Sequence, residues 1–186
     1  LLIMADGPAG IRIHKTYRTD GKKVYSERGM IPESMKMFMP KIMEVGMSLM
    51  SPKAPKNAQL VEHYCTAIPI GTAIAQSWNL EYARECGDII GAEMERFGVH
   101  LWLAPAMNIH RDIRCGRNYE FYSEDPLLSG LFAAGITKGV QKHAKCGTTI
   151  KHFCANNQEL NRHFLDSIVS ERALREIYLR GFEIAV

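Results

Sequence analysis

The chain alternates between short apolar segments and longer segments whose apolar residues recur every three or four positions. The first pattern predicts buried strands and the second predicts amphipathic helices. In chain order, the predicted elements are a strand at 1–5, a helix at 80–97, a strand at 99–104, a helix at 126–143, a strand at 147–150 and a helix that starts after residue 170. Such alternation predicts a parallel sheet with right-handed helical crossovers, and therefore an α/β fold.

Residues suited to helix ends mark the boundaries of these helices. Asn79 and Ser170 precede two of them, and their side chains are good N-caps. Asp125 followed by Pro126 is a cap followed by a first-turn proline. Gly98 follows Phe97 and is a suitable helix stop.

The N-terminal third of the chain gives weaker signals. Residues 11–28 are polar and predict a long loop, and 51–57 predict an exposed connection. The methionine-rich stretch from Met35 to Met50 has apolar residues at helical spacing and predicts a helix whose methionines fill a core. Residues 67–70 predict a short strand. No chemistry is predicted for this third of the chain.

Composition excludes several classes of protein. A net charge of +3 over 186 residues is too small to favour nucleic-acid binding. No apolar run reaches the roughly 20 residues of a membrane span. The odd number of cysteines, 5, without paired spacing predicts reduced thiols and a cytoplasmic location. Both ends of the chain fall inside predicted elements, which indicates a piece of a longer protein from which a leader could be missing.

Polar side chains follow three of the predicted strands. Asp6 ends the first, the loop holding Arg117 follows the second, and Lys151 with His152 ends the third. Because parallel strands share a direction, these side chains should lie on one side of the sheet. No glycine-rich phosphate motif follows any strand, which favours a TIM-type (β/α) barrel over a mononucleotide-binding sheet. A complete barrel takes about 250 residues, so this one would be incomplete.

Together with Arg162, these side chains suit a ligand rich in hydroxyl groups. A carboxylate such as Asp6 accepts hydroxyl protons, the cations donate to hydroxyl oxygens, and His152 can donate to a further hydroxyl. A grip on phosphate, a plain turn role for Asp6 and solvated charges at Lys151 and His152 remain alternatives. No metal-binding or serine-hydrolase spacing occurs, and Cys154 is predicted to be a buried structural thiol.

Separated blocks of sequence carry a family resemblance. They are Asp6 to Arg12, Gly116 to Pro126, Lys151 to Phe153 followed by Asn157 to Glu159 and Arg162, and Val169 to Glu176. In this order they resemble the N-terminal barrel of family-3 glycoside hydrolases, most of all the bacterial β-glucosidases. The resemblance is nearly continuous from residue 66 onward and rests on residues 1–12 before that.

The resemblance implies retaining hydrolysis of terminal β-D-glucosyl residues, without metal or cofactor. Residues matching Asp6, Arg117, Lys151, His152 and Arg162 would hold the hydroxyls of the sugar that precedes the cleaved bond. The nucleophile, an aspartate on a later strand, and the acid/base, a glutamate from a second α/β-sandwich domain, would lie beyond residues 1–186, so no catalytic residue is predicted within them. Glu120 and Glu124 are predicted to be buried partners of the arginine-bearing loop.

Two other functions remain open at this point. One is a β-N-acetylhexosaminidase of the same family, although Cys154 to Asn157 lacks the His-Gly loop of those enzymes. The other is a sugar-binding module without catalysis. The predicted partners are a glycoside and the remainder of the parent chain, whereas nucleic acid and membranes are not expected.

Overall fold

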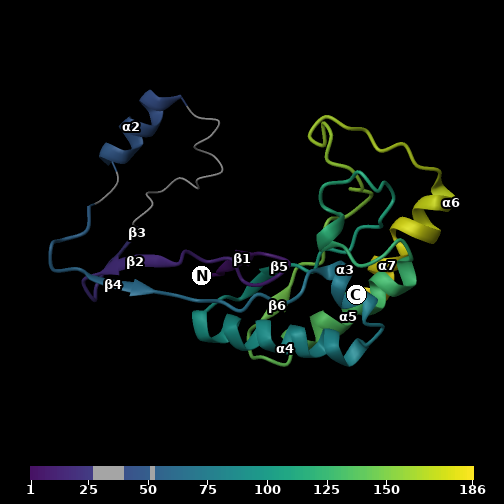
Figure 1. Cartoon of the computed structure of the whole chain (residues 1–186), viewed down its shortest axis with the longest axis horizontal. Coiled ribbons are helices and arrows are strands. Elements are labelled where there is room, and N and C mark those ends of the chain that lie inside the picture. The colour runs from purple at the N-terminus through teal and green to yellow at the C-terminus, as the bar shows by residue number, and fades with distance from the viewer. Residues whose placement is uncertain (27–39, 51–52) are drawn as a thin grey trace. The chain divides into compact units, whose positions relative to one another are not determined.

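A computed structural model describes residues 1–26, 40–50 and 53–186. The chain forms two compact units, one built from residues 1–12 with 65–186 and the other from residues 13–64. The first unit contains a parallel sheet with helices packed against it, and the second contains a small antiparallel sheet (Figure 1). In the described residues, no helix is both long enough and apolar enough to cross a membrane.

The parallel sheet has the strand order β1-β5-β6. Strand β1 is Met4–Asp6, β5 is Leu101–Leu103 and β6 is Gly147–Thr148. Met4 pairs with Leu101, and Leu101 pairs in turn with Gly147, so the three strands run in register and in one direction. The predicted strands at 1–5, 99–104 and 147–150 are thus confirmed, although each is shorter than predicted.

The helices of this unit begin and end where the capping residues predict. Helix α4 spans Leu80–Phe97, and the Asn79 side chain accepts hydrogen bonds from the first backbone N–H groups. Gly98 ends α4 with a φ of 68°, in the left-handed region that glycine adopts without strain. Helix α5 spans Pro126–Val140, three residues shorter than the predicted 126–143, and Asp125 caps it.

Glycines allow α4 and α5 to pack with their backbones almost in contact. A Cβ atom on Gly87 would lie 2.1 Å from the carbonyl oxygen of Ile136, and one on Gly139 would lie 2.2 Å from that of Arg84. Fully buried side chains fill the space between these helices and the sheet. They include Trp102 on β5, Ile90 and Met94 on α4, and Phe132 and Ile136 on α5.

The C-terminal segment begins at the predicted cap. The Ser170 hydroxyl accepts from the backbone N–H of Ala173, and α6 spans Glu171–Ala173. A π-helical turn, η2 (Leu174–Tyr178), and α7 (Arg180–Ala185) follow. Helix α7 packs against α5, as Figure 1 shows.

Two elements differ from the predictions for the rest of the chain. Residues 11–28 contain a hairpin, not a loop: β2 (Thr16–Thr19) pairs with β3 (Val24–Ser26) and with β4 (Gln59–Glu62). Asp20 stabilises its turn by accepting from the N–H groups of Lys22 and Lys23. Lysines and arginines alternate with the strand-forming residues here, so the sequence lacks the apolar pattern of a strand.

The predicted strand at 67–70 is absent. These residues form neither helix nor strand and lead into α3 (Gly71–Gln76), with the Ile68 N–H donating one backbone bond to the Ala9 carbonyl. Pro69 has no N–H and cannot contribute to a strand ladder. The helix predicted at 35–50 is confirmed over α2 (Lys41–Met50), whereas residues 35–39 lie outside the described part of the chain. The predicted core role of its methionines is wrong for Met43, which is 56% exposed because no described residue covers that face of α2. Residues 53–58 precede β4 without helix or strand.

Candidate sugar-binding site

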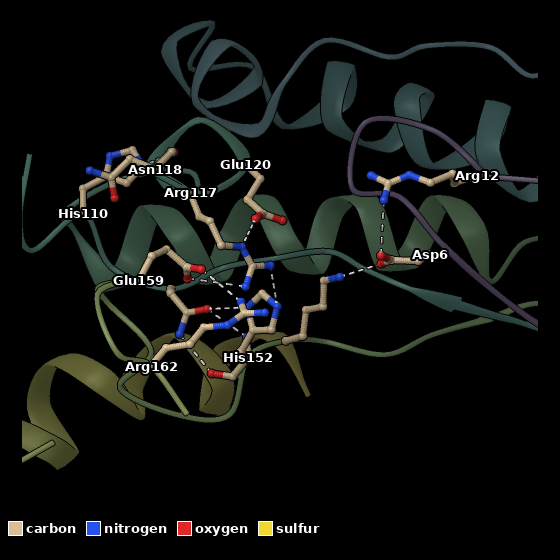
Figure 2. A network of polar contacts seen from close by, with 11 residues as sticks. Asp6, Arg12, His110, Arg117, Asn118, Glu120, His152, Glu159 and Arg162 are labelled. Carbon is tan, nitrogen blue, oxygen red and sulfur yellow. Dashed lines mark hydrogen bonds and ion pairs between the residues drawn. The ribbon is translucent and has the colours of Figure 1, made fainter. Parts of the chain in front are cut away.

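A pocket of about 680 Å³ opens where the strands of the parallel sheet end. All five residues singled out in the sequence line it, namely Asp6, Arg117, Lys151, His152 and Arg162. Figure 2 shows the side chains of Asp6, Arg117, His152 and Arg162, which extend from the end of β1 and from the loops beyond β5 and β6. Lys151 joins them through its hydrogen bond to Asp6. Residues far apart in the sequence therefore meet because the strands are parallel and in register.

Asp6 and Lys151 form an ion pair at the strand ends. The Lys151 Nζ donates to Asp6 Oδ1 at 2.7 Å, and Arg12 lies on the other side of the carboxylate at 3.8 Å. A bridge between Ala106 and Lys151 continues the parallel pairing beyond β6 and places Lys151. Burial opposes ionisation of Asp6, but the hydrogen bond from Lys151 and the Gly7 N–H outweigh it and lower the pKa of the carboxyl.

Arg117 is held by three partners. Its Nε donates to the Glu120 carboxylate, its Nη2 contacts His152 Nε2 at 2.7 Å, and its Nη1 lies 3.7 Å from Glu159 Oε1. Glu120 is only 5% exposed and lies on the short 3₁₀ helix η1 (Asn118–Glu120), one turn after the arginine. Burial by itself would lower the pKa of Arg117. The hydrogen bond and the charge of Glu120 outweigh this effect and raise the pKa, so the guanidinium stays charged.

His152 is surrounded by cations and is neutral. Burial lowers its pKa first, and the charges of Arg117, Lys151 and Arg162 lower it further, to about 4, with Asp6 opposing them. Both ring nitrogens have protein partners, because Nδ1 lies 3.0 Å from Asn108 Oδ1 and Nε2 contacts Arg117. The prediction that His152 donates to a ligand hydroxyl does not fit this arrangement.

Glu159 joins the two arginines of the site. Its Oε2 accepts from Arg162 Nη1 at 3.0 Å, while its Oε1 faces Arg117. Oε1 is buried and has no hydrogen bond among the described residues, so the Arg117 contact is electrostatic only. The carboxylate thereby keeps two like charges in one pocket, which would otherwise repel each other.

Helix α3 fixes the loop that carries Arg117. The Thr72 hydroxyl lies 3.0 Å from the carbonyl oxygen of Asn118, the first residue of η1, and 2.9 Å from that of Phe121, which follows η1. A Cβ atom on Gly71 would lie 2.4 Å from the Glu120 carbonyl oxygen, so only glycine allows this approach. The α3–η1 contact therefore sets the position from which Arg117 reaches the pocket.

Some predictions for this region need correction. Glu120 is buried and pairs with the arginine as predicted, but Glu124 is exposed because it lies beyond the buried turn, next to the α5 cap. Cys154 is half-buried and lines the pocket, because the chain leaves the strand before reaching it. All five cysteines fall among the described residues and are free thiols.

The sequence interpretation did not single out four contributors to the site: Asn108, Arg12, Thr72 and Glu159. Asn108 contacts a residue 44 positions away and Thr72 contacts one 49 positions away, and no local sequence pattern reveals such contacts. Arg12 and Glu159 stand inside the blocks that carried the family resemblance. That is the one signal that could have drawn attention to them.

The carboxylates of the pocket are all engaged by neighbouring cations. Of the carboxylates lining the pocket, Asp6 is held by Lys151 and Glu120 by Arg117. Because each is engaged by a cation, the two do not form a free pair of carboxyl groups in which one could attack a substrate and the other could protonate it. Within the described residues, no cluster of three or more His, Cys, Asp or Glu side chains could hold a metal ion. Fixed donors around one acceptor can orient a polyhydroxylated ligand.

A parallel sheet with crossover helices and a polar pocket at its carboxyl edge defines part of a (β/α)-barrel domain. Comparison with known proteins gives the family. Residues 57–186 match the glycosyl hydrolase family 3 N-terminal domain. The chain belongs to this family, and its fold is an incomplete TIM-type barrel.

Individual relatives agree with this assignment. The chain is 54% identical over 120 residues to a β-glucosidase of Ruminococcus albus, covering 64% of this chain and 13% of the relative. β-Glucosidase 3B of Thermotoga neapolitana in complex with glucose superposes with a TM-score of 0.73 at 44% identity, covering 99% of this chain and 20% of that one. The β-glucosidase of Bifidobacterium adolescentis superposes with a TM-score of 0.68 at 30% identity, again covering 99% and 20%. This sequence thus spans a fifth or less of each of these relatives.

Proposed function

We propose that this chain is the sugar-binding half of the active site of a retaining β-glucosidase. The observation that carries the proposal is the convergence of the Asp6–Lys151 pair and the Arg117–His152 pair in one pocket. The relatives named β-glucosidases, one of them in complex with glucose, support glucose as the sugar. The proposal covers residues 1–186 as part of the barrel domain, with the remainder of the enzyme supplied by further sequence.

The pocket contacts would contribute to rate as well as to affinity. Retaining glycosidases use two carboxyl groups about 5–5.5 Å apart, one as nucleophile and one as acid/base, and pass through an oxocarbenium-like transition state. We place both carboxyls outside residues 1–186. Within this chain, Asp6 accepts sugar hydroxyl protons while Lys151 and Arg162 donate to hydroxyl oxygens. Such contacts accelerate hydrolysis to the extent that they strengthen as the transition state forms.

The test is a substrate panel on the full-length protein that carries this sequence. Aryl β-D-glucoside, β-D-xyloside and N-acetyl-β-D-glucosaminide are compared, and proton NMR identifies the anomer released first. The expected result is preference for the glucoside with β-glucose as the first product. Hydrolysis of the N-acetylglucosaminide alone would instead indicate a hexosaminidase. Glucose binding without any hydrolysis would indicate a binding module.

A further inference from the structure

Asn108 makes three contacts with one neighbour, His152. Its Oδ1 accepts from the His152 backbone N–H at 2.9 Å and lies 3.0 Å from the ring Nδ1. Its Nδ2 donates to the His152 carbonyl oxygen at 2.9 Å. Asn108 is only 3% exposed, so water cannot replace these bonds.

These contacts determine which way the amide of Asn108 points. A backbone N–H can only donate and a backbone carbonyl can only accept, so the atom facing the N–H is the oxygen and the atom facing the carbonyl is the nitrogen. The same oxygen faces His152 Nδ1, and an amide oxygen can only accept. The proton of the neutral ring therefore resides on Nδ1.

The other side of the ring gives the same answer independently. Arg117 Nη2 lies 2.7 Å from His152 Nε2, and a guanidinium has donors only. Nε2 must therefore present its lone pair. The charged groups around the ring are Arg117, Lys151, Arg162 and Asp6, so the cations outnumber the carboxylate and oppose protonation of Nε2. The edge contact with Phe121 adds no charge.

We infer that Asn108 is a positioning residue that holds His152 as the Nδ1–H tautomer, which makes Nε2 a hydrogen-bond acceptor within the sugar pocket. Nε2 then accepts a hydrogen bond from Arg117 and thereby orients this guanidinium within the pocket. The inference rests on the proposed function in that it takes the ligand to be a sugar. Without the Asn108 oxygen the proton could move to Nε2, where it would face the Arg117 donor.

The variant that tests this is Asn108→Asp in the full-length protein. A carboxylate still accepts from Nδ1–H but also stabilises the doubly protonated ring. Exchange of the imidazole C2 proton with deuterium, followed by mass spectrometry across pH 3–9, reports the pKa of each histidine without any ligand. We expect the pKa of His152 to rise by at least about one unit in Asn108→Asp, as for a histidine gaining a carboxylate neighbour. Asn157→Asp is the matched control, because Asn157 is buried and, among the described residues, its side chain hydrogen-bonds only to the Ile109 carbonyl.

Activity gives the second readout. In Asn108→Asp the acid-side inflection in the plot of kcat/KM against pH should shift to higher pH by the same amount as the His152 pKa. A general loss of structure would instead lower kcat/KM at every pH. An unchanged His152 pKa in Asn108→Asp, or a shift equal to that in Asn157→Asp, overturns the inference. If Asn108→Asp does not fold, a wild-type His152 pKa at or above the usual 6.5 overturns it as well. A shifted pKa without glucoside hydrolysis would overturn the proposed function alone.

Discussion

Lys151 Nζ donates to Asp6 Oδ1 at 2.7 Å, although the two residues are 145 positions apart in the chain. The pair joins the ends of β1 and β6, the two outer strands of the parallel sheet, across β5. The lysine is only 16% exposed in its side chain. This contact thus keeps the Asp6 carboxylate charged and also links the ends of the two outer strands.

Replacing Asp6 with alanine should reduce glucoside turnover far more than it reduces stability. Hydrogen bonds to charged groups contribute about 1.5–3 kcal/mol, so losing one or two sugar contacts should lower kcat/KM roughly 10- to 10³-fold. Kinetics and thermal unfolding are measured on the same preparation of the full-length protein. Asp20→Ala is the control, because Asp20 is exposed in the β2–β3 turn. A lower melting temperature with unchanged kcat/KM would contradict a binding role for Asp6.

Replacing Thr72 with valine should raise KM. The substitution keeps the shape of the side chain but removes its bonds to the Asn118 and Phe121 carbonyls, which fix the Arg117 loop. Leaving those carbonyls unpaired should cost about 1–3 kcal/mol of stability. Thr137→Val is the control, since Thr137 bonds to Thr148 between α5 and β6, away from the pocket. An equal KM for both variants would show that the Thr72 contact does not position Arg117.

The low pKa of His152 should make the protein less stable in mild acid. An unfolded histidine titrates near 6.5 and His152 titrates at about 4, so between these values the unfolded state binds the extra proton. Stability attributable to this residue should therefore fall as the pH drops from 6.5 to 4, by at most about 3 kcal/mol. Denaturant midpoints of wild type and His152→Gln at several pH values measure it. A difference that does not change with pH would contradict the low pKa.

His143 should have the opposite pH dependence. It follows α5, and its ring nitrogens lie 2.7 Å from Asp88 and 3.3 Å from Glu95, both on α4. The hydrogen bond that the His143 ring donates to Asp88 raises the pKa of His143, and Glu95 adds to this against the effect of burial. Its stabilising contribution should be complete below about pH 6.5, where the unfolded histidine titrates, and should disappear as the pH rises through the raised pKa of folded His143. The gap in melting temperature between wild type and His143→Gln should narrow at high pH, and a gap that widens would refute the assignment.

Replacing Gly87 with alanine should destabilise the α4–α5 contact. The added carbon would lie 2.1 Å from the backbone carbonyl oxygen of Ile136, which cannot move without shifting α5. Overpacking of this kind costs about 1–3 kcal/mol. Gly46→Ala makes the same change inside α2, where nothing lies within 4 Å, and should instead stabilise slightly. Thermal unfolding of both variants decides, and equal effects would mean that the close helix contact is not maintained in solution.

Much of the fold of residues 65–186 was predictable because its signals are local. Asn79, Asp125 and Ser170 cap helices through bonds to N–H groups two or three residues ahead, so each signal lies within one turn. Strand directions then place Asp6, Lys151 and His152 on one edge of the sheet, because parallel strands cannot place their ends otherwise. The hairpin at 16–26 was missed because lysines and arginines alternate with its strand residues, and because its partner strand β4 lies 40 to 46 positions further along the chain.

The sequence by itself determined the α/β alternation, the capped helix starts and five of the side chains that line the pocket. Only the tertiary structure decided the state in which those side chains act. Asn108 meets His152, and Glu159 meets Arg117, across separations that depend on how loops fold over the sheet. The charge of a histidine and its choice of tautomer depend on the atoms within about 4 Å of the ring. Residues far apart in the chain supply those atoms, so no local pattern contains them.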